Sequence, residues 1–174
     1  KSRGMLAFVL IARMTPALSY LIPWFIMFRA VGLNNTLTAL VITHLVIGLP
    51  VVIWVMVGFF DGLPRDLDEA AAVDGASPWQ AFWHVALPLG RPGIVVGALL
   101  AFIFSWNNFI FAVVLAGRET RTLPVLVFNT LTFERLAFGP LAAAAILVTL
   151  PVLIVTVLVQ RQIVVGMTAG AVKS

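Results

Sequence analysis

The 174-residue sequence is 61% hydrophobic and only 10% charged, with a formal net charge of +4 and no cysteine. Soluble domains carry about 25% charged residues, so this composition excludes a fold surrounded by water. The absence of thiols excludes disulfides and thiolate metal sites within these residues.

Long stretches without charge predict membrane-spanning helices. Residues 30–60, 92–117 and 136–160 contain no Asp, Glu, Lys or Arg, and residues 4–28 contain only Arg13. Each stretch is long enough for the about 20 helical residues that a bilayer core requires. We therefore expect an all-α polytopic membrane protein with four transmembrane helices in these residues, at 4–28, 36–60, 93–116 and 139–160.

Prolines and tryptophans mark the first two predicted spans. Pro16, Pro23 and Pro50 lie inside them. Proline removes a backbone donor, and in membranes such breaks are tolerated where neighbouring helices or a cavity satisfy the freed groups. Trp24 and Trp54, near span ends, are predicted to be anchors at the membrane interface.

Basic residues lie mostly at the ends of the predicted spans. Six fall on the side of the loop at residues 61–92 and four on the other side, which predicts a cytoplasmic position for this loop. The net positive charge is thereby assigned to orientation and to lipid headgroup contacts, and no nucleic-acid partner is expected.

The 61–92 loop begins with the signals of one short helix. Asp66, Asp68 and Glu69 would occupy its first turn, where the helix dipole favours acids. An alanine run follows, and Gly75 after Asp74 predicts a glycine stop in the left-handed conformation.

A second short helix is predicted to start at once. Ser77 suits the N-cap, Pro78 the first helical position and Gln80 a capping box, and Leu87-Pro88 is predicted to end this helix. Its apolar face consists of Trp79, Phe82, Trp83 and Ala86. Two interpretations remain open: a surface helix resting on lipid headgroups, or a two-helix knob that a soluble partner grips.

Polar residues at membrane depth are candidates for function. Arg13 is either a pathway or gate residue, or a snorkelling or interhelical hydrogen-bonding group. His44 is expected to pair with a neighbouring helix rather than to relay protons. Ser105, Asn107 and Asn108 either join helices or line a hydrated path that offers hydrogen bonds to a solute.

Four stretches resemble the permeases of binding-protein-dependent ABC importers, in the carbohydrate-uptake branch close to the maltose-type permeases. Residues 69–88, EAAAVDGASPWQAFWHVALP, resemble the cytoplasmic EAA loop of that family. Residues 105–109 resemble the Trp-Asn-x-Phe segment of its penultimate span, residues 166–173 its C-terminal tail, and residues 58–60 the run into its loop.

The resemblance implies a role for each matching position. The loop would be the coupling element that docks in a cleft of the ATP-binding subunit, through Glu69, Ala70, Ala71, Asp74, Gly75, Leu87 and Pro88. The resemblance also favours a translocation path that involves Ser105, Asn107 and Asn108, and Arg13 is added to this path as an ionisable group at membrane depth. Thr168, Gly170 and Lys173, in a cytoplasmic tail at 161–174, would reach into the ATPase dimer.

The resemblance also implies partners and a place in the cell. These are a dimeric ATP-binding subunit, a second permease that is a different chain, a periplasmic or lipid-anchored solute-binding protein, a carbohydrate and the lipid bilayer. The location would be the bacterial cell (inner) membrane, as a multi-pass protein. The family has six spans, so two spans are expected to precede Lys1.

No enzymatic role is expected for the chain itself. The sequence contains no G-x-x-x-x-G-K-[ST] phosphate loop and no pattern of metal ligands or catalytic residues. ATP and Mg²⁺ would therefore bind to the partner ATPase, and this chain would bind no cofactor. The alternatives are an importer permease for a non-sugar solute and a passive channel or scaffold; the sequence does not name the sugar.

Overall fold

The computed structural model describes residues 4, 7, 9, 11, 14–64, 66–131 and 138–169, and of residues 130, 131, 138 and 161–169 it describes the backbone alone. The described residues form helices and connecting turns without a strand, which confirms the all-α prediction. The helices are α2 (Ala17–Ala30), α3 (Leu37–Asp61), α4 (Asp66–Val73), α5 (Pro78–Ala81), the π-helix η1 (Phe82–Ala86), α6 (Leu87–Trp106), α7 (Ile110–Leu115), α8 (Leu123–Leu131) and α9 (Phe138–Ala169).

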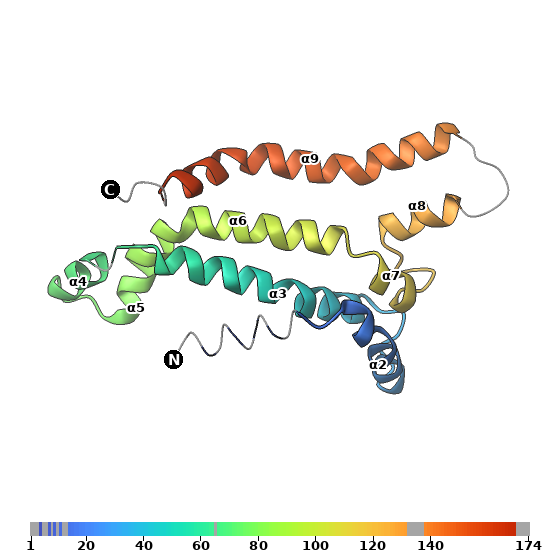
Figure 1. Cartoon of the computed structure of the whole chain (residues 1–174), viewed down its shortest axis with the longest axis horizontal. Helices are drawn as coiled ribbons and strands as arrows, with labels where there is room; N and C mark the ends of the chain where they lie inside the picture. The colour runs from blue at the N-terminus through green and yellow to red at the C-terminus, as the bar shows by residue number, and fades with distance from the viewer. Residues whose placement is uncertain are drawn as a thin grey trace.

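Three long helices lie side by side and form the body of the molecule (Figure 1). α6 lies between α3 and α9 and contacts both. α4 and α5 lie beyond one end of this layer, and α2, α7 and α8 lie at the other end. Among the described residues, three helical stretches are long and apolar enough to cross a membrane: Leu37–Asp61, Pro78–Trp106 and Gly139–Gln160.

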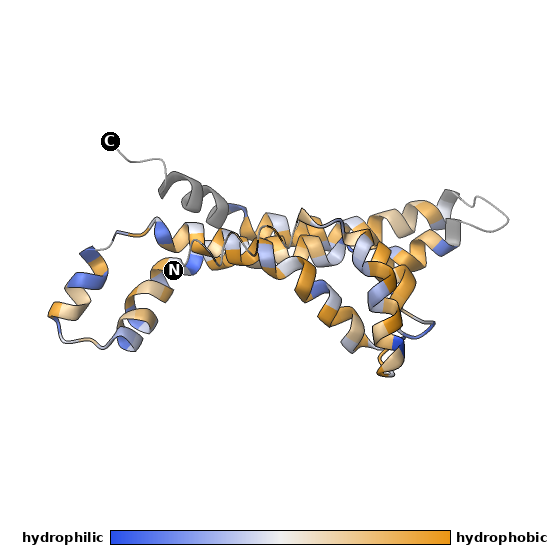
Figure 2. Ribbon diagram, turned by 60° about the horizontal axis from the view of Figure 1, so that its bottom comes forward, coloured by the Kyte–Doolittle hydropathy of each residue, from blue (hydrophilic) through white to orange (hydrophobic). Residues whose placement is uncertain are grey.

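The outer surface of the long helices is apolar, as Figure 2 shows by hydropathy. On α9 no residue of the apolar stretch Gly139–Gln160 is buried inside the chain. The exposed side chains of this stretch include Ile146, Leu150 and Leu158. Because exposing so much apolar surface to water is unfavourable, these helices require lipid or another apolar partner around them.

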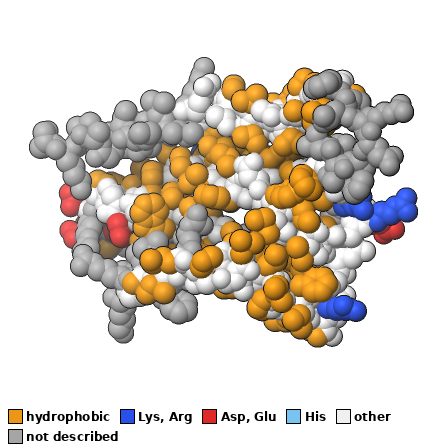
Figure 3. All heavy atoms as spheres, turned by 45° about the vertical axis from the view of Figure 1, so that its right-hand side comes forward, with side chains coloured by type: hydrophobic (Ala, Val, Ile, Leu, Met, Phe, Trp, Pro, Cys, Tyr) orange, Lys and Arg blue, Asp and Glu red, His pale blue; other side chains and the backbone are white. Residues whose placement is uncertain are grey.

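The charged side chains that the structure describes lie at the two ends of the layer. In Figure 3, acidic groups lie at the end that carries α4, an apolar band covers the middle, and most of the basic groups lie at the opposite end. The acids of the α4 end include Asp66, Asp68 and Glu69. This distribution fits helices that cross a bilayer from one end of the layer to the other.

The first predicted span, 4–28, is not one helix. The backbone leaves the helical conformation at Thr15 and Pro16, where Pro16 has φ −56° and ψ 130°, and α2 starts at Ala17. A residue before proline is disfavoured in the α region, and proline itself has no N–H to continue the ladder. With 14 residues, α2 is shorter than the three spanning helices.

The third predicted span, 93–116, is wrong at both ends. α6 begins at Leu87, ends at Trp106 and is followed by the separate short helix α7. At the break the Ile103 carbonyl accepts from both the backbone N–H and the Nδ2 of Asn107, at 3.0 and 2.9 Å. The next N–H, that of Asn108, donates only three residues back, to the Ser105 carbonyl, so the α-helical ladder ends here.

The fourth predicted span, 139–160, agrees with the apolar stretch Gly139–Gln160 of α9. α9 continues as helix to Ala169, into the predicted tail at 161–174. The predicted second span, 36–60, agrees with α3 within one residue at each end, because Thr36 caps the helix by accepting from the Ala39 N–H at 3.2 Å.

A small aromatic core fixes the end of the layer opposite α4. Phe28, Leu40, Phe111 and Leu115 are buried there, contributed by α2, α3 and α7. Hydrogen bonds tie the turn after α2 to the loop after α7: the Asn35 N–H donates to the Leu115 carbonyl at 3.0 Å. These contacts hold α2 and α3 against α7 at this end.

Close packing of α3 against α6 depends on glycines. Gly90, Gly93 and Gly97 are buried on α6 and face α3. A Cβ at position 90 would lie 2.7 Å from Phe60 Cε1, and a Cβ at position 93 would lie 2.7 Å from Phe59 Cδ1. Small residues allow this approach, which is the main source of helix association where the surrounding lipid is as apolar as the helices.

We predict that Gly93→Ala destabilises the protein, because the new methyl group must displace the Phe59 ring. The expected loss is about 1–3 kcal/mol, as for other overpacked sites. The measurement is thermal unfolding of the full-length protein in detergent, followed by its tryptophan fluorescence. Gly58→Ala is the matched control, since a Cβ at that position meets no atom within 4 Å. Equal melting temperatures for Gly93→Ala and wild type would contradict the packing argument.

Candidate functional site

The first half of the loop between α3 and α6 folds as its sequence predicts. Asp66, Asp68 and Glu69 occupy the first turn of α4, and all three side chains are exposed. Their carboxylates lie where the positive end of the helix dipole favours them. Ala71 is the one residue of α4 that is buried. The helix therefore presents its acids outward and packs through alanine.

α4 ends at a glycine in the left-handed conformation, as predicted. Gly75 has φ +82°, its N–H donates to the Ala72 carbonyl at 3.1 Å, and the Ala76 N–H donates to the Ala71 carbonyl at 2.9 Å. These two bonds form a Schellman motif, which satisfies carbonyls at the end of the helix. A sharp, defined turn follows from this cap.

The predicted capping box is present at the start of α5. The Gln80 N–H donates to Ser77 Oγ at 3.3 Å, and the Ser77 N–H donates to Gln80 Oε1 at 2.8 Å. Both bonds are local, so the start of α5 is specified by residues 77–80 alone. We refer to residues 66–81 as the α4–α5 hairpin.

The second predicted helix does not end at Leu87-Pro88. The chain continues from α5 through η1 into α6, so that one helical stretch runs from Pro78 to Trp106. In η1 the Leu87 N–H donates to the Phe82 carbonyl, five residues back. This wider turn absorbs Pro88, which has no N–H for the His84 carbonyl and lies at the start of α6, where proline is tolerated.

A groove of about 470 Å³ lies between the two arms of the hairpin. It is lined by Asp68 and Ala72 of α4 and by Ala81 and Phe82 on the other arm. Small side chains on both arms keep the groove open.

Three aromatic rings form an exposed cluster beside this groove. Trp79 is 69% exposed, and its ring centroid lies 5.9 Å from that of Phe82 and 5.7 Å from that of Trp83. The predicted apolar face is therefore present, and nothing within the described chain covers it. Its position is compatible with both interpretations made from the sequence, a helix that rests on lipid headgroups and a knob that a soluble partner grips, since either can cover such a face.

The predicted loop residues fall into two groups. Glu69, Ala70, Ala71, Asp74 and Gly75 gather on α4 and its C-cap, whereas Leu87 and Pro88 lie in the first turn of α6, at the base of the hairpin. In the first group Glu69, Ala70, Asp74 and Gly75 are exposed and Ala71 is buried, and the second group connects the hairpin to the spans.

The polar residues of the spans are brought together around the end of α6. His44 Nδ1 and Ser105 Oγ are 2.8 Å apart, so His44 pairs with a neighbouring helix as predicted. The Asn108 N–H donates to the Ser105 carbonyl at 3.2 Å, and the Asn107 side chain is exposed. Ser105, Asn107 and Asn108 thus share the break between α6 and α7, where backbone groups are freed from the helix.

Other predicted residues lie outside the described part of the chain. These are Arg13, Gly170 and Lys173. Of Thr168 only the backbone is described, and it is helical in α9. Within the described residues no group of three His, Cys, Asp or Glu side chains is placed to hold a metal ion.

A family model described as "Binding-protein-dependent transport system inner membrane component" matches residues 2–168. The chain belongs to this family. Together with its three long apolar helices, this membership makes it a multi-pass protein of the cell membrane.

Relatives in this family are named as sugar transport permeases. The chain is 39% identical to the trehalose transport system permease protein SugB of Mycobacterium tuberculosis (strain CDC 1551 / Oshkosh), over 98% of this chain and 64% of that protein. It is 37% identical to the trehalose/maltose transport system permease protein MalG of Thermococcus litoralis, over 95% of this chain and 60% of that protein. The chain thus spans less than two thirds of the length of these two relatives.

Two tryptophans take part in packing and hydrogen bonding between helices. The ring of Trp24, a predicted interface anchor, contacts those of Phe28 and Phe111, at centroid distances of 6.0 and 5.7 Å, and its anchoring role stays a prediction. Trp106 was not singled out, although its Nε1 donates to the Val148 carbonyl at 2.9 Å and joins α6 to α9. Trp106 lies within the charge-free stretch 92–117, and a buried indole N–H usually finds a hydrogen-bond partner. These two facts were the available signal for such a bond.

We predict that Gly75→Ala loosens the end of α4. No atom lies within 4 Å of a Cβ at this position, so the cost of about 1–2 kcal/mol comes only from the left-handed conformation. Amide hydrogen exchange at residues 70–76 should accelerate by roughly 5–30-fold. Gly75→Asn is the matched control. Its exchange rate should lie between those of wild type and Gly75→Ala, because asparagine tolerates the left-handed conformation. Unchanged exchange in Gly75→Ala would refute the role assigned to this turn.

Proposed function

We propose that this chain is part of one permease subunit of an ATP-driven ABC importer that takes up a carbohydrate by alternating access. The observation that carries the proposal is the α4–α5 hairpin, in a chain that belongs to the binding-protein-dependent transport family. Its caps fix its shape, and its acids and aromatic rings face outward at one end of the spanning helices.

The hairpin has the properties of a docking element. Both of its helix ends are fixed by local hydrogen bonds, so it can enter a partner's cleft without losing much conformational freedom. Glu69 stands exposed on α4, and the ring of Trp79 provides a large apolar contact, the kind of residue that dominates binding energies at interfaces. The partner is an ATP-binding subunit, which would hold ATP and Mg²⁺, while this chain binds neither.

The carbohydrate substrate is supported by the names of the relatives. They include permeases for trehalose, for trehalose and maltose, and for diacetylchitobiose. Ser105, Asn107 and Asn108, and Arg13 outside the described residues, are proposed to line the path. Their amides and hydroxyls suit a neutral, hydroxyl-rich solute, and a non-sugar polar solute is the second candidate.

The remaining partners follow from the same proposal. A second permease chain would cover part of the apolar surface of α9, and a periplasmic or lipid-anchored solute-binding protein would deliver the sugar at the end opposite the hairpin. Thr168, Gly170 and Lys173 are proposed to contact the ATPase dimer. A passive channel or scaffold would need no ATP-binding partner and would leave the capped hairpin without a role.

The first experiment is a pull-down of the tagged full-length protein expressed with its neighbouring genes. We expect an ATP-binding subunit to co-purify, and we expect Glu69→Lys to release it. Charge reversal at a central interface residue costs about 2 kcal/mol or more, which lowers the affinity roughly 30-fold. Glu119→Lys is the matched control, because Glu119 is also exposed but lies in the loop after α7, at the opposite end of the molecule. A protein that purifies stably without an ATPase would support the channel or scaffold instead.

A second prediction concerns the path. Asn108→Ala should lower sugar uptake by about 2–10-fold with normal assembly, since loss of one hydrogen bond between uncharged groups is worth about 0.5–1.5 kcal/mol. Uptake of radiolabelled sugar into cells is the measurement, with Asn129→Ala on the exposed side of α8 as the control. Full uptake in the Asn108 variant would mean that this residue only packs helices.

A further inference from the structure

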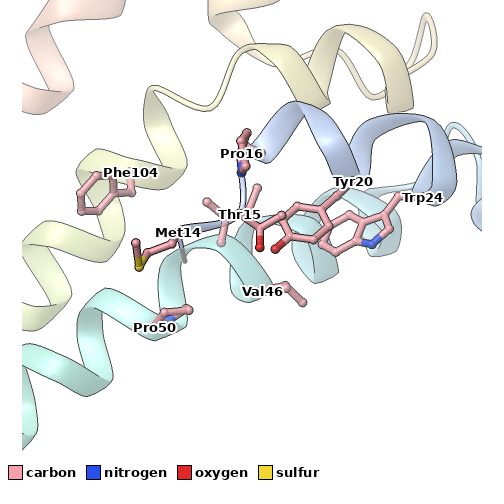
Figure 4. Close-up of a pocket in the computed structure, with 10 residues that line it drawn as sticks. Met14, Thr15, Pro16, Tyr20, Trp24, Val46, Pro50 and Phe104 are labelled. Atoms are coloured by element: carbon pink, nitrogen blue, oxygen red, sulfur yellow. The ribbon is translucent and has the colours of Figure 1, made fainter. Parts of the chain in front are cut away.

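A pocket of about 450 Å³ opens at the break between the start of the chain and α2 (Figure 4). Its lining comes from Met14 to Ala17 at the break, from Tyr20 and Trp24 of α2, and from α3 and α6. Its volume lies within the range of about 300–1,000 Å³ that small-molecule sites occupy. None of the path residues discussed above is among its described lining residues.

The regular helical hydrogen bonding of the backbone is broken on two sides of this pocket. Thr15 and Pro16 are outside any helix, and Pro50 of α3 lines the pocket opposite them. Because Pro50 has no N–H, the carbonyl of Val46 loses its usual helical donor, and Val46 also lines the pocket. Non-helical backbone at membrane depth is tolerated where it lines a cavity, and interrupted helices are where transporters bind their substrates.

The side chains combine aromatic faces with a few polar groups. The rings of Tyr20 and Trp24 are stacked, with centroids 5.9 Å apart and planes inclined by 30°. Figure 4 shows them on one side of the pocket, with Pro50 and Phe104 toward the other side. The Thr15 hydroxyl, the Tyr20 hydroxyl and the Trp24 N–H are the polar side-chain groups among the described lining residues.

The aromatic wall is held in place before any ligand enters. Trp24 packs against Phe28 and Phe111, which belong to the buried core at this end of the layer. A preorganised wall needs no ordering on binding, which favours affinity. A pyranose ring matches this wall, because its axial C–H groups form an apolar face and its hydroxyls lie around the rim, whereas a lipid chain would make no use of the polar groups.

We propose that this pocket binds one ring of the carbohydrate that the importer carries. Tyr20 and Trp24 stack against the C–H face of the sugar, and the Thr15 hydroxyl and the Val46 carbonyl bond to its hydroxyls. The inference rests on the proposed function and adds a binding subsite on α2 and α3 to the polar residues at the end of α6.

The test uses the complete transporter and a panel of trehalose, maltose and diacetylchitobiose, the sugars named for its relatives. Val46→Trp fills the pocket and Tyr20→Leu removes part of its wall. Both should lower uptake of the sugar that wild type imports by roughly tenfold or more, since a pocket binds most of its ligand's surface. The ATPase should still co-purify. Val41→Trp is the matched control, because Val41 is 56% exposed on the same helix and is not among the described lining residues.

The outcomes separate this inference from the proposed function. Wild-type-like uptake in both pocket variants overturns the pocket site and leaves the importer intact. A wild-type complex that imports none of the sugars overturns the carbohydrate function and the site with it.

Variants that fail to assemble are replaced by Val46→Cys, a small change at a residue that is 49% exposed. The 174 residues contain no other cysteine. A charged, membrane-impermeant thiol reagent should label this position in the purified transporter, and the imported sugar should slow labelling at least roughly threefold. Absence of labelling would mean that lipid or a second permease fills the pocket, and this result overturns the proposal. Labelling that the sugar does not slow overturns it as well.

Discussion

The close approach of α3 and α6 is the constraint on which the rest of the structure depends. Three buried glycines on α6 meet the rings and thioether of Phe59, Phe60 and Met56 on α3. In lipid there is little hydrophobic drive to bring two helices together, so close van der Waals contact must do it. These contacts lie near the end that leads into the α4–α5 hairpin, which makes the two helices one stiff support for it.

Polar side chains between the long helices follow the same requirement, because lipid offers them no hydrogen-bond partner. His44 pairs with Ser105 between α3 and α6, Trp106 donates to the Val148 carbonyl between α6 and α9, and Thr43 donates within α3 to the Ala39 carbonyl at 2.7 Å. Two of these bonds join neighbouring helices, and both lie near the end of α6. The three long helices are therefore packed through glycine at one end and linked through hydrogen bonds toward the other.

Local chemistry explains which features the sequence predicted. The capping box at Ser77, the left-handed Gly75 and the cap at Thr36 each depend on a few neighbouring residues, so their patterns are specific. The wrong predictions arose where contacts between residues distant in the sequence outweigh a local sequence signal. Pro88 looked like a helix stop, yet a π turn absorbs it, and the helix continues because its apolar residues pack against α3. The packing of Trp24 against Phe111 was not predicted, because the two residues lie far apart in the sequence and no local pattern reveals their contact.

The arrangement also suggests how the two ends of the layer communicate. α3 runs from the core at one end, past Pro50 at the pocket, to the start of the hairpin, and α6 returns from the hairpin to Phe104 at the same pocket. Both helices that enter the hairpin therefore line the proposed sugar site. The glycine contacts prevent α3 and α6 from sliding independently at the hairpin end, whereas the aromatic core joins α3 to α2 and α7 at the other end. Pro50 interrupts the hydrogen-bond ladder of α3 between these two ends, so a bend of α3 at this proline would change the shape of the pocket that Pro50 lines.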